Sequence, residues 1–182
     1  MAENKDTRLT IKGNYDLAAP SQMVAMAKVL KSHIVGQNLY TNIRGKNYAH
    51  VEGWQFAGGL MGLYAKITEV TDLSKNAEFK WRADAEIVNI KTKETVGTGI
   101  ALCSSKEATK SKFDEYAILS MAQTRAIGKA YRNLIGWVMK LAGYEATPSE
   151  EMFKMGQTPA APASQATQQE GVYKCVGASG KG

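Results

Sequence analysis

The stretch from Asp114 to Gly143 constrains the fold more strongly than any other part of the sequence. Its small and apolar residues recur every three or four positions, so on a wheel of about 100° per residue they share one narrow stripe. The stripe consists of Leu119, Ala122, Ala126, Ala130, Leu134, Trp137 and Leu141. Asp114 begins the stretch, where an acidic side chain can accept hydrogen bonds from free backbone N–H groups, and Gly143 ends it. The pattern predicts a long helix whose stripe faces the core.

Four cations of this predicted helix lie away from the apolar stripe. We call them the basic ridge, and they are Arg125, Lys129, Arg132 and Lys140. The first three follow one another at intervals of four and three residues, which places successive charges about one helical turn apart. We therefore expect the ridge to face solvent, where fixed cations can contact a polyanion. A solvated helix face without a partner is the competing interpretation.

The composition bounds the size of the core and the kind of partner. The chain has 182 residues, of which 44% are hydrophobic, and its formal net charge is +6 at pH 7. A chain of this length can bury one good core, so we expect a single ordered domain. The excess of Lys and Arg favours a polyanionic partner or an anionic surface. No apolar run long enough to span a membrane and no signal peptide are evident, so we expect no membrane contact and a cytoplasmic protein.

The sequence before the long helix predicts a first helix, a hairpin and a short helix. Residues 20–36 have apolar residues at helical spacing between a proline and a glycine. Residues 38–51 alternate around an Arg-Gly-Lys turn, which indicates a β-hairpin with Arg44 and Lys46 at its tip. The glycine-rich segment 52–63 then indicates a short helix that can pack closely.

Three alternating segments follow, and they predict an antiparallel meander. They are residues 64–73, 79–90 and 96–103. With the long helix packed across their apolar face, the expected class is α+β, with the strands before the main helix. The apolar residues of 53–63 exceed what a small core would cover, so we also expect a homo-oligomer.

The ends of the chain differ from its middle in composition. Residues 1–19 are polar and weakly patterned, which is typical of a mobile N-terminal arm. Residues 20–155 contain the predicted elements and form the expected core domain. Residues 156–182 are rich in Pro, Ala, Gln and Gly and poor in apolar bulk, so we expect a disordered tail.

Residue types that bind metals or form disulfides are scattered. Cys103 and Cys175 lie far apart without a CxxC pair, and His33 and His50 have no partner at ligand spacing. We therefore expect free thiols, no metal site and no cofactor.

The order of the elements resembles the annealing core of the Rad-fifty-two superfamily of recombination proteins. The matching pieces are HVEGW (50–54), the meander with Gly97 and Gly99, and TRAIGKAYRNLIGW (124–137). AILSMAQTRAIGKAYRN together with LAGYEATPSEEM is also similar to small phage-type single-strand annealing proteins of that superfamily. The sequence departs from the family at Gly128, where a further cation is often found, which leaves part of the inner basic site to Arg125.

The resemblance implies a ring or filament of identical subunits that anneals DNA without ATP during homologous recombination and DNA repair. Phosphates of single-stranded DNA would face a basic groove, and the bases would stay exposed for a complementary strand. Annealing breaks no bond, so neither catalytic residues nor an enzymatic activity is expected. A single-strand binding protein or an exonuclease is left open as a further partner, and a phage-encoded protein would act in the cytoplasm of its bacterial host.

The candidate site residues follow from the ridge, the hairpin and the resemblance. The expected DNA contacts are Arg125, Lys129, Arg132, Lys140, Arg44 and Lys46. Tyr48, Trp54 and Tyr131 either stack on bases or pack in the core or at a subunit interface, and aromatic residues more often do the latter.

Two other classes of function stay open. Glu52, Asp84 and Glu86 could be imagined as the metal carboxylates of a nuclease, although no third carboxylate or Lys forms a motif beside the pair on one strand. A non-catalytic scaffolding oligomer would use the same basic face for another partner.

Overall fold

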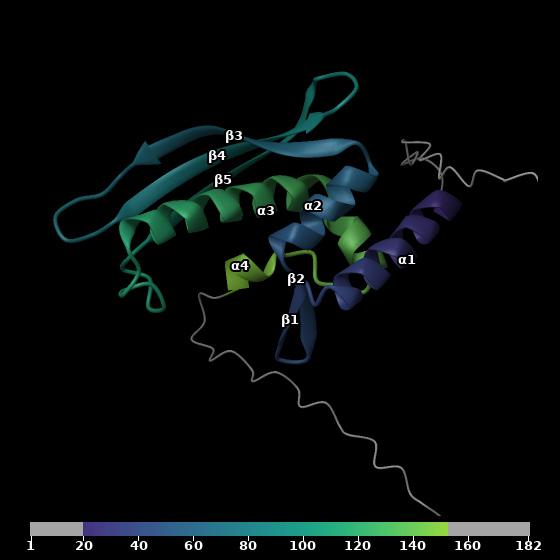
Figure 1. Cartoon of the computed structure of the whole chain (residues 1–182), viewed down its shortest axis with the longest axis horizontal. Helices are drawn as coiled ribbons and strands as arrows, with labels where there is room; N and C mark the ends of the chain where they lie inside the picture. The colour runs from purple at the N-terminus through teal and green to yellow at the C-terminus, as the bar shows by residue number, and fades with distance from the viewer. Residues whose placement is uncertain (1–19, 153–182) are drawn as a thin grey trace, which may run out of the picture.

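A three-stranded antiparallel sheet with a long helix along one face forms the centre of the fold (Figure 1). The computed structural model describes residues 20–152. Its elements, in chain order, are α1 (Pro20–Gly36), β1 (Tyr40–Ile43), β2 (Lys46–Ala49), α2 (Val51–Leu60), β3 (Leu63–Asp72), β4 (Lys80–Asn89), β5 (Thr95–Ser104), α3 (Glu115–Leu141) and α4 (Ser149–Met152).

The observed elements confirm the α+β class, the hairpin, the three-stranded meander and the long helix packed on it. The predicted arm, 1–19, and the predicted tail, 156–182, lie outside the described residues, as do the last three residues of the predicted core domain. Within residues 20–152, none of the helices is both long and apolar enough to cross a membrane.

The sheet has one apolar face and one polar face. Its strand order is β3-β4-β5, and in β4 the buried residues Ala83, Ala85 and Ile87 alternate with charged residues. The register places Ala83 opposite Ala101 and Ala85 opposite Gly99 on β5. Because side chains alternate between the two faces of a strand, these small residues lie together beneath α3. The charged residues of β4 lie on the opposite face.

The backbone of α3 approaches the backbone of β5 very closely. A Cβ added to Gly99 would lie 2.5 Å from the carbonyl oxygen of Ala126 and 2.8 Å from the Cα of Ala130. Ala122, Ala126 and Ala130 are completely buried at this contact, which confirms that part of the predicted stripe. Small residues on both elements therefore set the distance between helix and sheet.

In the last turns of α3, the buried residues differ from those of the predicted stripe. Ile135 has φ −125° and ψ 19°, which are not helical values. Beyond this kink Val138 and Met139 are buried, whereas Trp137 and Leu141 are 47% and 48% exposed. The prediction that Trp137 and Leu141 face the core is wrong, because the kink changes the direction of the final turns.

Side chains of α3 also bond the backbone of β5. Asn133 Nδ2 donates to the Thr98 carbonyl at 3.1 Å, and Arg125 Nη1 donates to the Leu102 carbonyl at 3.2 Å. β5 is the last strand in the sheet order, so within the described part of the chain no further strand pairs with it. α3 thus supplies hydrogen-bond donors to the edge strand in addition to covering its face.

α2 packs against α3, and its glycine-rich sequence is covered within one chain. Trp54 and Ala57 are completely buried, and a Cβ at Gly58 would lie 2.9 Å from the hydroxyl oxygen of Tyr131. Burial of the segment 53–63 therefore needs no second copy, contrary to the reasoning from its composition. Oligomerisation itself stays a prediction.

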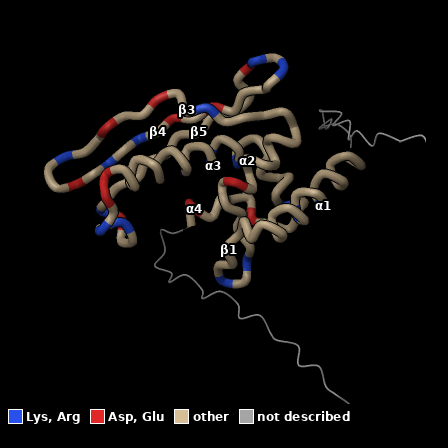
Figure 2. Tube along the Cα trace, viewed as in Figure 1, with Lys and Arg blue, Asp and Glu red and all other residues tan. Residues whose placement is uncertain are grey.

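The β1–β2 hairpin projects from the body of the molecule (Figure 1). Arg44 and Gly45 at its tip have φ 52° and 78°, as a tight two-residue hairpin turn requires. The Asn42 side-chain oxygen accepts a hydrogen bond from the Gly45 N–H at 3.1 Å. Figure 2 shows Lys and Arg positions, in blue, at this tip, which lies away from the sheet, and both Arg44 and Lys46 are exposed.

Candidate nucleic-acid interface

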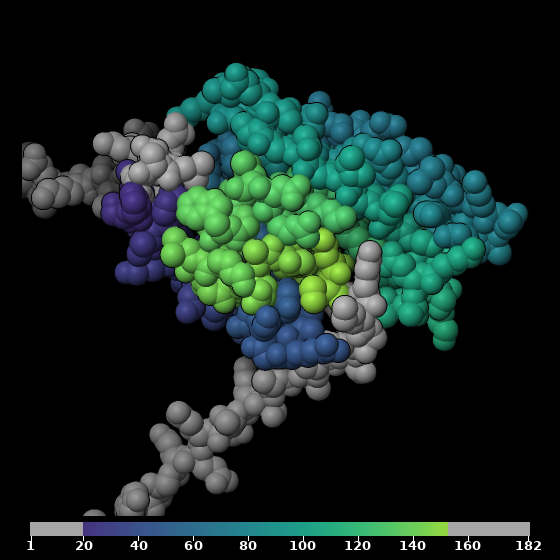
Figure 3. Space-filling model, turned by 180° about the vertical axis from the view of Figure 1, so that it is seen from behind, coloured from purple at the N-terminus to yellow at the C-terminus, as the bar shows by residue number. Residues whose placement is uncertain are grey.

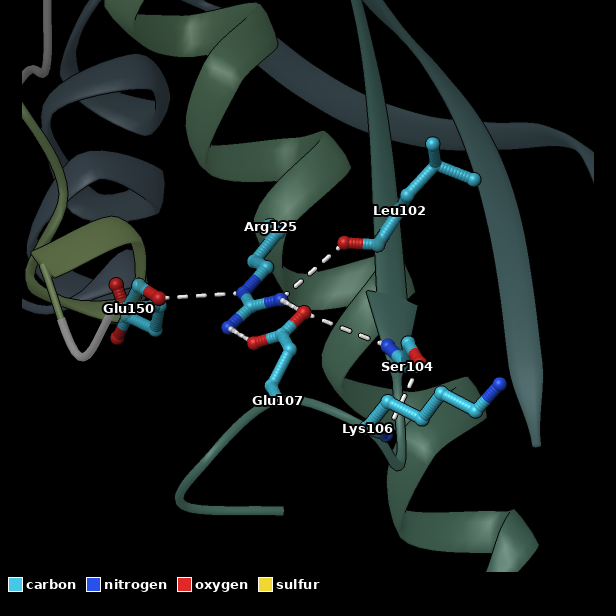
Figure 4. A network of polar contacts seen from close by, with 6 residues as sticks. All are labelled: Leu102, Ser104, Lys106, Glu107, Arg125 and Glu150. Atoms are coloured by element: carbon cyan, nitrogen blue, oxygen red, sulfur yellow. Dashed lines mark hydrogen bonds and ion pairs between the residues drawn. The ribbon is translucent and has the colours of Figure 1, made fainter. Parts of the chain in front are cut away.

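Arg125 lies inside the protein, where four hydrogen bonds hold its guanidinium (Figure 4). It donates to both carboxylate oxygens of Glu107 at 2.7 Å, and to the carbonyls of Leu102 and Glu150 at 3.2 Å. Its side chain is only 3% exposed. The prediction that Arg125 belongs to a solvent-facing ridge is wrong, because β5, the loop after β5 and α4 all close over it.

The partners of Arg125 keep its charge in place. Burial lowers the pKa of Arg125, but the hydrogen bonds with Glu107 and the nearby acidic groups outweigh burial, so its pKa is raised. Lys110, in the same loop as Glu107, is buried, and both burial and the charge of Arg125 lower the pKa of Lys110. Arg125 is therefore a paired structural cation, and a phosphate could reach it only if this packing opened.

Lys129 follows Arg125 by one turn and lines an open groove. The groove has a volume of about 380 Å³ and lies between β5, α3 and α4. Ile100 and Leu102 of β5 line it and are 51% and 46% exposed, and Glu151 of α4 lines it as well. Two cations of the predicted ridge line this groove, the buried and paired Arg125 and the half-buried Lys129.

Arg132 and Lys140 are ion-paired with residues that follow α3. Arg132 Nη1 lies 2.9 Å from Glu151 Oε2, and Lys140 Nζ lies 2.6 Å from Glu145 Oε2. The Arg132 and Lys140 side chains are still 35% and 53% exposed, so solvent reaches both pairs. Their partners Glu151 and Glu145 are 14% and 25% exposed, so both pairs are part-buried. An ion pair that solvent screens contributes about 1 kcal/mol or less, so an incoming anion can compete with pairs that solvent reaches.

The hairpin brings a further cation to Glu145. The Glu145 N–H donates to the Asn47 carbonyl at 2.8 Å, which joins β2 to the chain after α3. The hydrogen bond from Lys140 lowers the pKa of Glu145, and the charge of Lys46 acts in the same direction. Figure 3 shows these parts together, with the blue hairpin beside the green and yellow-green residues of α3 and α4. Lys46 therefore lies at the C-terminal end of the ridge, whereas Arg44 lies at the hairpin tip.

Residues 144–152, which we call the return segment, are anchored by more than these ion pairs. Pro148 is completely buried, and a Cβ at Gly128 would lie 2.9 Å from Pro148 Cγ. The position where the resemblance would place another cation is thus closed by Pro148. Glu150 Oε1 accepts a hydrogen bond from the Val51 N–H at 3.1 Å, at the start of α2, and burial raises the pKa of Glu150. The backbone of the return segment is therefore held in place by packing and by Glu150.

The cations of this surface come from α3 and the hairpin, and the carboxylates come from the return segment. No protein-family model matches the chain, and no curated protein sequence matches it either. The resemblance to the Rad-fifty-two superfamily therefore stays an expectation.

The three aromatic residues considered for base stacking lie in the core. Tyr48, Trp54 and Tyr131 are 8%, 0% and 1% exposed. Trp54 Nε1 donates to the Ala49 carbonyl at 3.3 Å, and burial raises the pKa of Tyr131 to about 12. Their rings are covered by the chain itself, so in this conformation they pack in the core and present no face to a base.

The carboxylates considered for a nuclease are engaged in separate contacts. Asp84 accepts two hydrogen bonds from Arg82, at 2.8 and 2.7 Å, and Glu86 accepts one from Thr95 at 3.1 Å. Glu52 is exposed on α2. Between residues 20 and 152, no group of three His, Cys, Asp or Glu side chains is arranged so that it could hold a metal ion.

His33, His50 and Cys103 make packing or hydrogen-bond contacts with other parts of the chain. His33 stacks on Phe56 with 3.7 Å between ring centroids, and His50 Nε2 lies 2.8 Å from Thr41 Oγ1. Cys103 is buried, which raises the pKa of its thiol, and Cys175 lies outside the described residues.

The acidic partners of the ridge are the site residues that the sequence reasoning missed. Glu107, Glu145 and Glu151 each pair with a ridge cation. One signal was available, because two adjacent carboxylates follow Pro148 and Ser149 shortly after a helix rich in cations. That signal indicates a capped acidic turn, but it does not indicate which cation each carboxylate meets.

Proposed function

We propose that this protein binds single-stranded DNA through its phosphates and anneals complementary strands without ATP. The observation that carries the proposal is that four cations share two carboxylates on one surface. The cations are Lys46, Lys129, Arg132 and Lys140, and the carboxylates are Glu145 and Glu151. The surface is therefore positive even with its ion pairs formed, and such a surface attracts a polyanion.

The chemistry of the surface favours the backbone of a strand over its bases. Lys and Arg neutralise phosphates without reading sequence, and the three aromatic residues considered for base stacking, Tyr48, Trp54 and Tyr131, are buried in the core. Bases held away from the protein remain free to pair. Pairing with a complementary strand then needs neither a nucleophile nor a metal.

The proposal includes assembly and biological role. Several copies in a ring or filament would extend the surface along a strand, as annealing during homologous recombination and repair requires. The partners would be single-stranded DNA, its complement and other copies of this chain, with a single-strand binding protein or an exonuclease as a further one. If the protein is phage-encoded, the reaction would take place in the cytoplasm of the bacterial host.

Two measurements on the full chain test the proposal, binding to labelled oligo-dT and annealing of two labelled complementary oligonucleotides. Fluorescence anisotropy on oligo-dT across a salt series should show tight binding at low salt. Four phosphate contacts should give a slope of log K against log salt of about −3, since each contact contributes roughly 0.7 for a single strand. Annealing should be faster than the uncatalysed rate in EDTA and without ATP. Absence of binding at low salt, or binding without any faster annealing, would contradict the proposal.

A further inference from the structure

The proposed DNA surface carries anions of its own. We propose that the carboxylates of Glu151 and Glu145 occupy two phosphate subsites in the free protein, and that single-stranded DNA binds by displacing them. This inference rests on the proposed function, because it assigns the positions at which the phosphates would bind. The two carboxylates are six residues apart in the return segment, and each meets cations from another element.

The first subsite is formed by Arg132 and Lys129 around Glu151. Arg132 Nη1 contacts Glu151 Oε2 at 2.9 Å, and Lys129 lines the same groove as Glu151. Glu151 Oε1 is buried without a hydrogen-bond partner among the described residues. A carboxylate with one unsatisfied oxygen is held less well than a group that satisfies all of its oxygens. A phosphate in this position has further oxygens to offer to Lys129 while it bonds Arg132.

The second subsite is formed by Lys140 and Lys46 around Glu145. Lys140 Nζ contacts Glu145 Oε2 at 2.6 Å, and Lys46 is close enough for its charge to act on the same carboxylate. One cation comes from α3 and the other from the hairpin, so an anion bound here bridges two elements. The hydrogen bond between the Glu145 N–H and the Asn47 carbonyl holds these elements together independently of the carboxylate.

Displacement needs only side-chain movement. Pro148 is buried against Gly128, and Glu150 bonds both Arg125 and the start of α2, so the backbone of the return segment stays where it is. Glu145 and Glu151 can then rotate toward solvent while a phosphate takes the place of each carboxylate. The carboxylates of Glu145 and Glu151 thus compete weakly with phosphates for the same cations. A polymer that contacts both subsites at once displaces them more readily than a single phosphate ion does.

The test of this inference removes the negative charge of Glu151 or Glu145 in the full chain. E151Q and E145Q should each raise the affinity for oligo-dT by roughly twofold to fivefold, the range that an exposed ion pair represents. E94Q is the matched control, because it removes one negative charge from the exposed turn before β5, at the opposite end of that strand from Leu102. E94Q should leave the affinity unchanged within error. Circular dichroism and thermal unfolding establish that all three variants are folded.

A double-mutant cycle separates a subsite from a general effect of charge. In an R132A background the E151Q substitution should lose most of its gain, whereas E145Q should keep its gain. An equal gain from E151Q with and without Arg132, or a gain no larger than that of E94Q, would overturn the subsite assignment. Failure of the wild type and of every variant to bind the oligonucleotide would instead contradict the proposed function. If the wild type binds oligo-dT and E151Q binds it with the same affinity, the subsite assignment is wrong and the proposed function still stands.

Discussion

Arg125 and Glu107 form a two-bond pair, with both nitrogen–oxygen distances at 2.7 Å, at a point where three segments meet. The pair ties α3 to the loop after β5, and the same guanidinium reaches the carbonyls of Leu102 and Glu150. Arg125 is covered almost completely, whereas the Glu107 side chain is 23% exposed. The first cation of the predicted ridge therefore organises the fold around the proposed site.

Arg125→Ala should destabilise the protein strongly. The substitution removes four hydrogen bonds, two to the Glu107 carboxylate and two to backbone carbonyls, and breaking a buried pair from one side costs about 3 to 5 kcal/mol. Arg125→Lys should recover only part of this loss, because an ammonium cannot form the two parallel bonds. Urea unfolding followed by circular dichroism measures both variants. A stable Arg125→Ala variant with weakened DNA binding would show instead that Arg125 contacts phosphate directly.

Lys129→Ala combined with Arg132→Ala should weaken DNA binding without unfolding the protein. Both side chains are half-buried and lie outside the core, and Ala is the best helix former. Each lost phosphate contact should reduce the salt slope by about 0.7, or about 1.4 in total, independently of base sequence. Lys28→Ala with Lys31→Ala on α1 is the matched control, since it removes two exposed cations from a different helix. Equal slopes for the two double variants would show that only net charge matters.

Gly99→Ala should destabilise the protein, whereas Gly97→Ala should be tolerated. Both glycines lie on β5 and face α3, but a Cβ at Gly99 would collide with the backbone of Ala126 and Ala130. A Cβ at Gly97 would lie 3.6 Å from the Ala130 carbonyl oxygen, an ordinary contact. Overpacking of this kind costs typically about 1 to 3 kcal/mol. Thermal unfolding of the two variants side by side tests the difference, and similar melting temperatures would mean that α3 can shift away from β5.

Glu150→Gln should change how stability depends on pH. Burial raises the pKa of Glu150 in the folded state above its usual value of 4.5, so the folded state favours the protonated carboxyl. Its stabilising contribution is therefore complete below pH 4.5 and is lost as pH rises through the raised pKa. Gln keeps the oxygen that accepts from Val51 and cannot ionise. The melting temperature of the variant relative to wild type should rise between pH 4 and pH 8, and a constant difference would contradict the burial of the charge.

Lys46→Ala should weaken DNA binding more than Arg44→Asn does. Lys46 lies near Glu145 and Lys140, whereas Arg44 is exposed at the hairpin tip. Asn is chosen at position 44 because φ is 52° there, and Asn tolerates this conformation. The two variants lose one charge each, so anisotropy at a single low salt concentration compares them directly. A larger loss for Arg44→Asn would place the main hairpin contact at the tip.

Local patterns predicted α1, the hairpin, α2, the three strands of the meander and α3, with boundaries close to those observed. α1 begins at Pro20 and ends at Gly36, as the proline and glycine indicate, and the strands follow the alternation of apolar residues. These features depend on neighbours in sequence, so a single sequence contains enough information for them. Trp137 and Leu141 were placed wrongly because the stripe assumes a straight helix, whereas α3 kinks at Ile135, next to Gly136.

The candidate site was harder to predict because it depends on contacts between distant residues. The helical wheel places Arg125 correctly outside the apolar stripe of α3. Its burial, however, depends on Glu107, 18 residues earlier, and on Glu150, 25 residues later. The position of Lys46 beside the end of α3 likewise depends on how the hairpin meets Glu145. Periodicity orients a residue on its own helix, and it carries no information about what folds over that side of the helix.

The bonds that Asn133 and Arg125 make to the Thr98 and Leu102 carbonyls have a consequence for how copies of this chain can join. An incoming strand that paired with β5 would compete with both side chains for these oxygens, and removing Arg125 from its place would also break the pair with Glu107. Lateral growth of the sheet from that side is therefore disfavoured. β3, the other edge strand, is engaged by α3 as well, because the Tyr131 hydroxyl forms a hydrogen bond with the backbone of Ala65. An assembly built by continuing one sheet into the next needs both borders, so rings or filaments of this protein should be joined through its helices and hairpin.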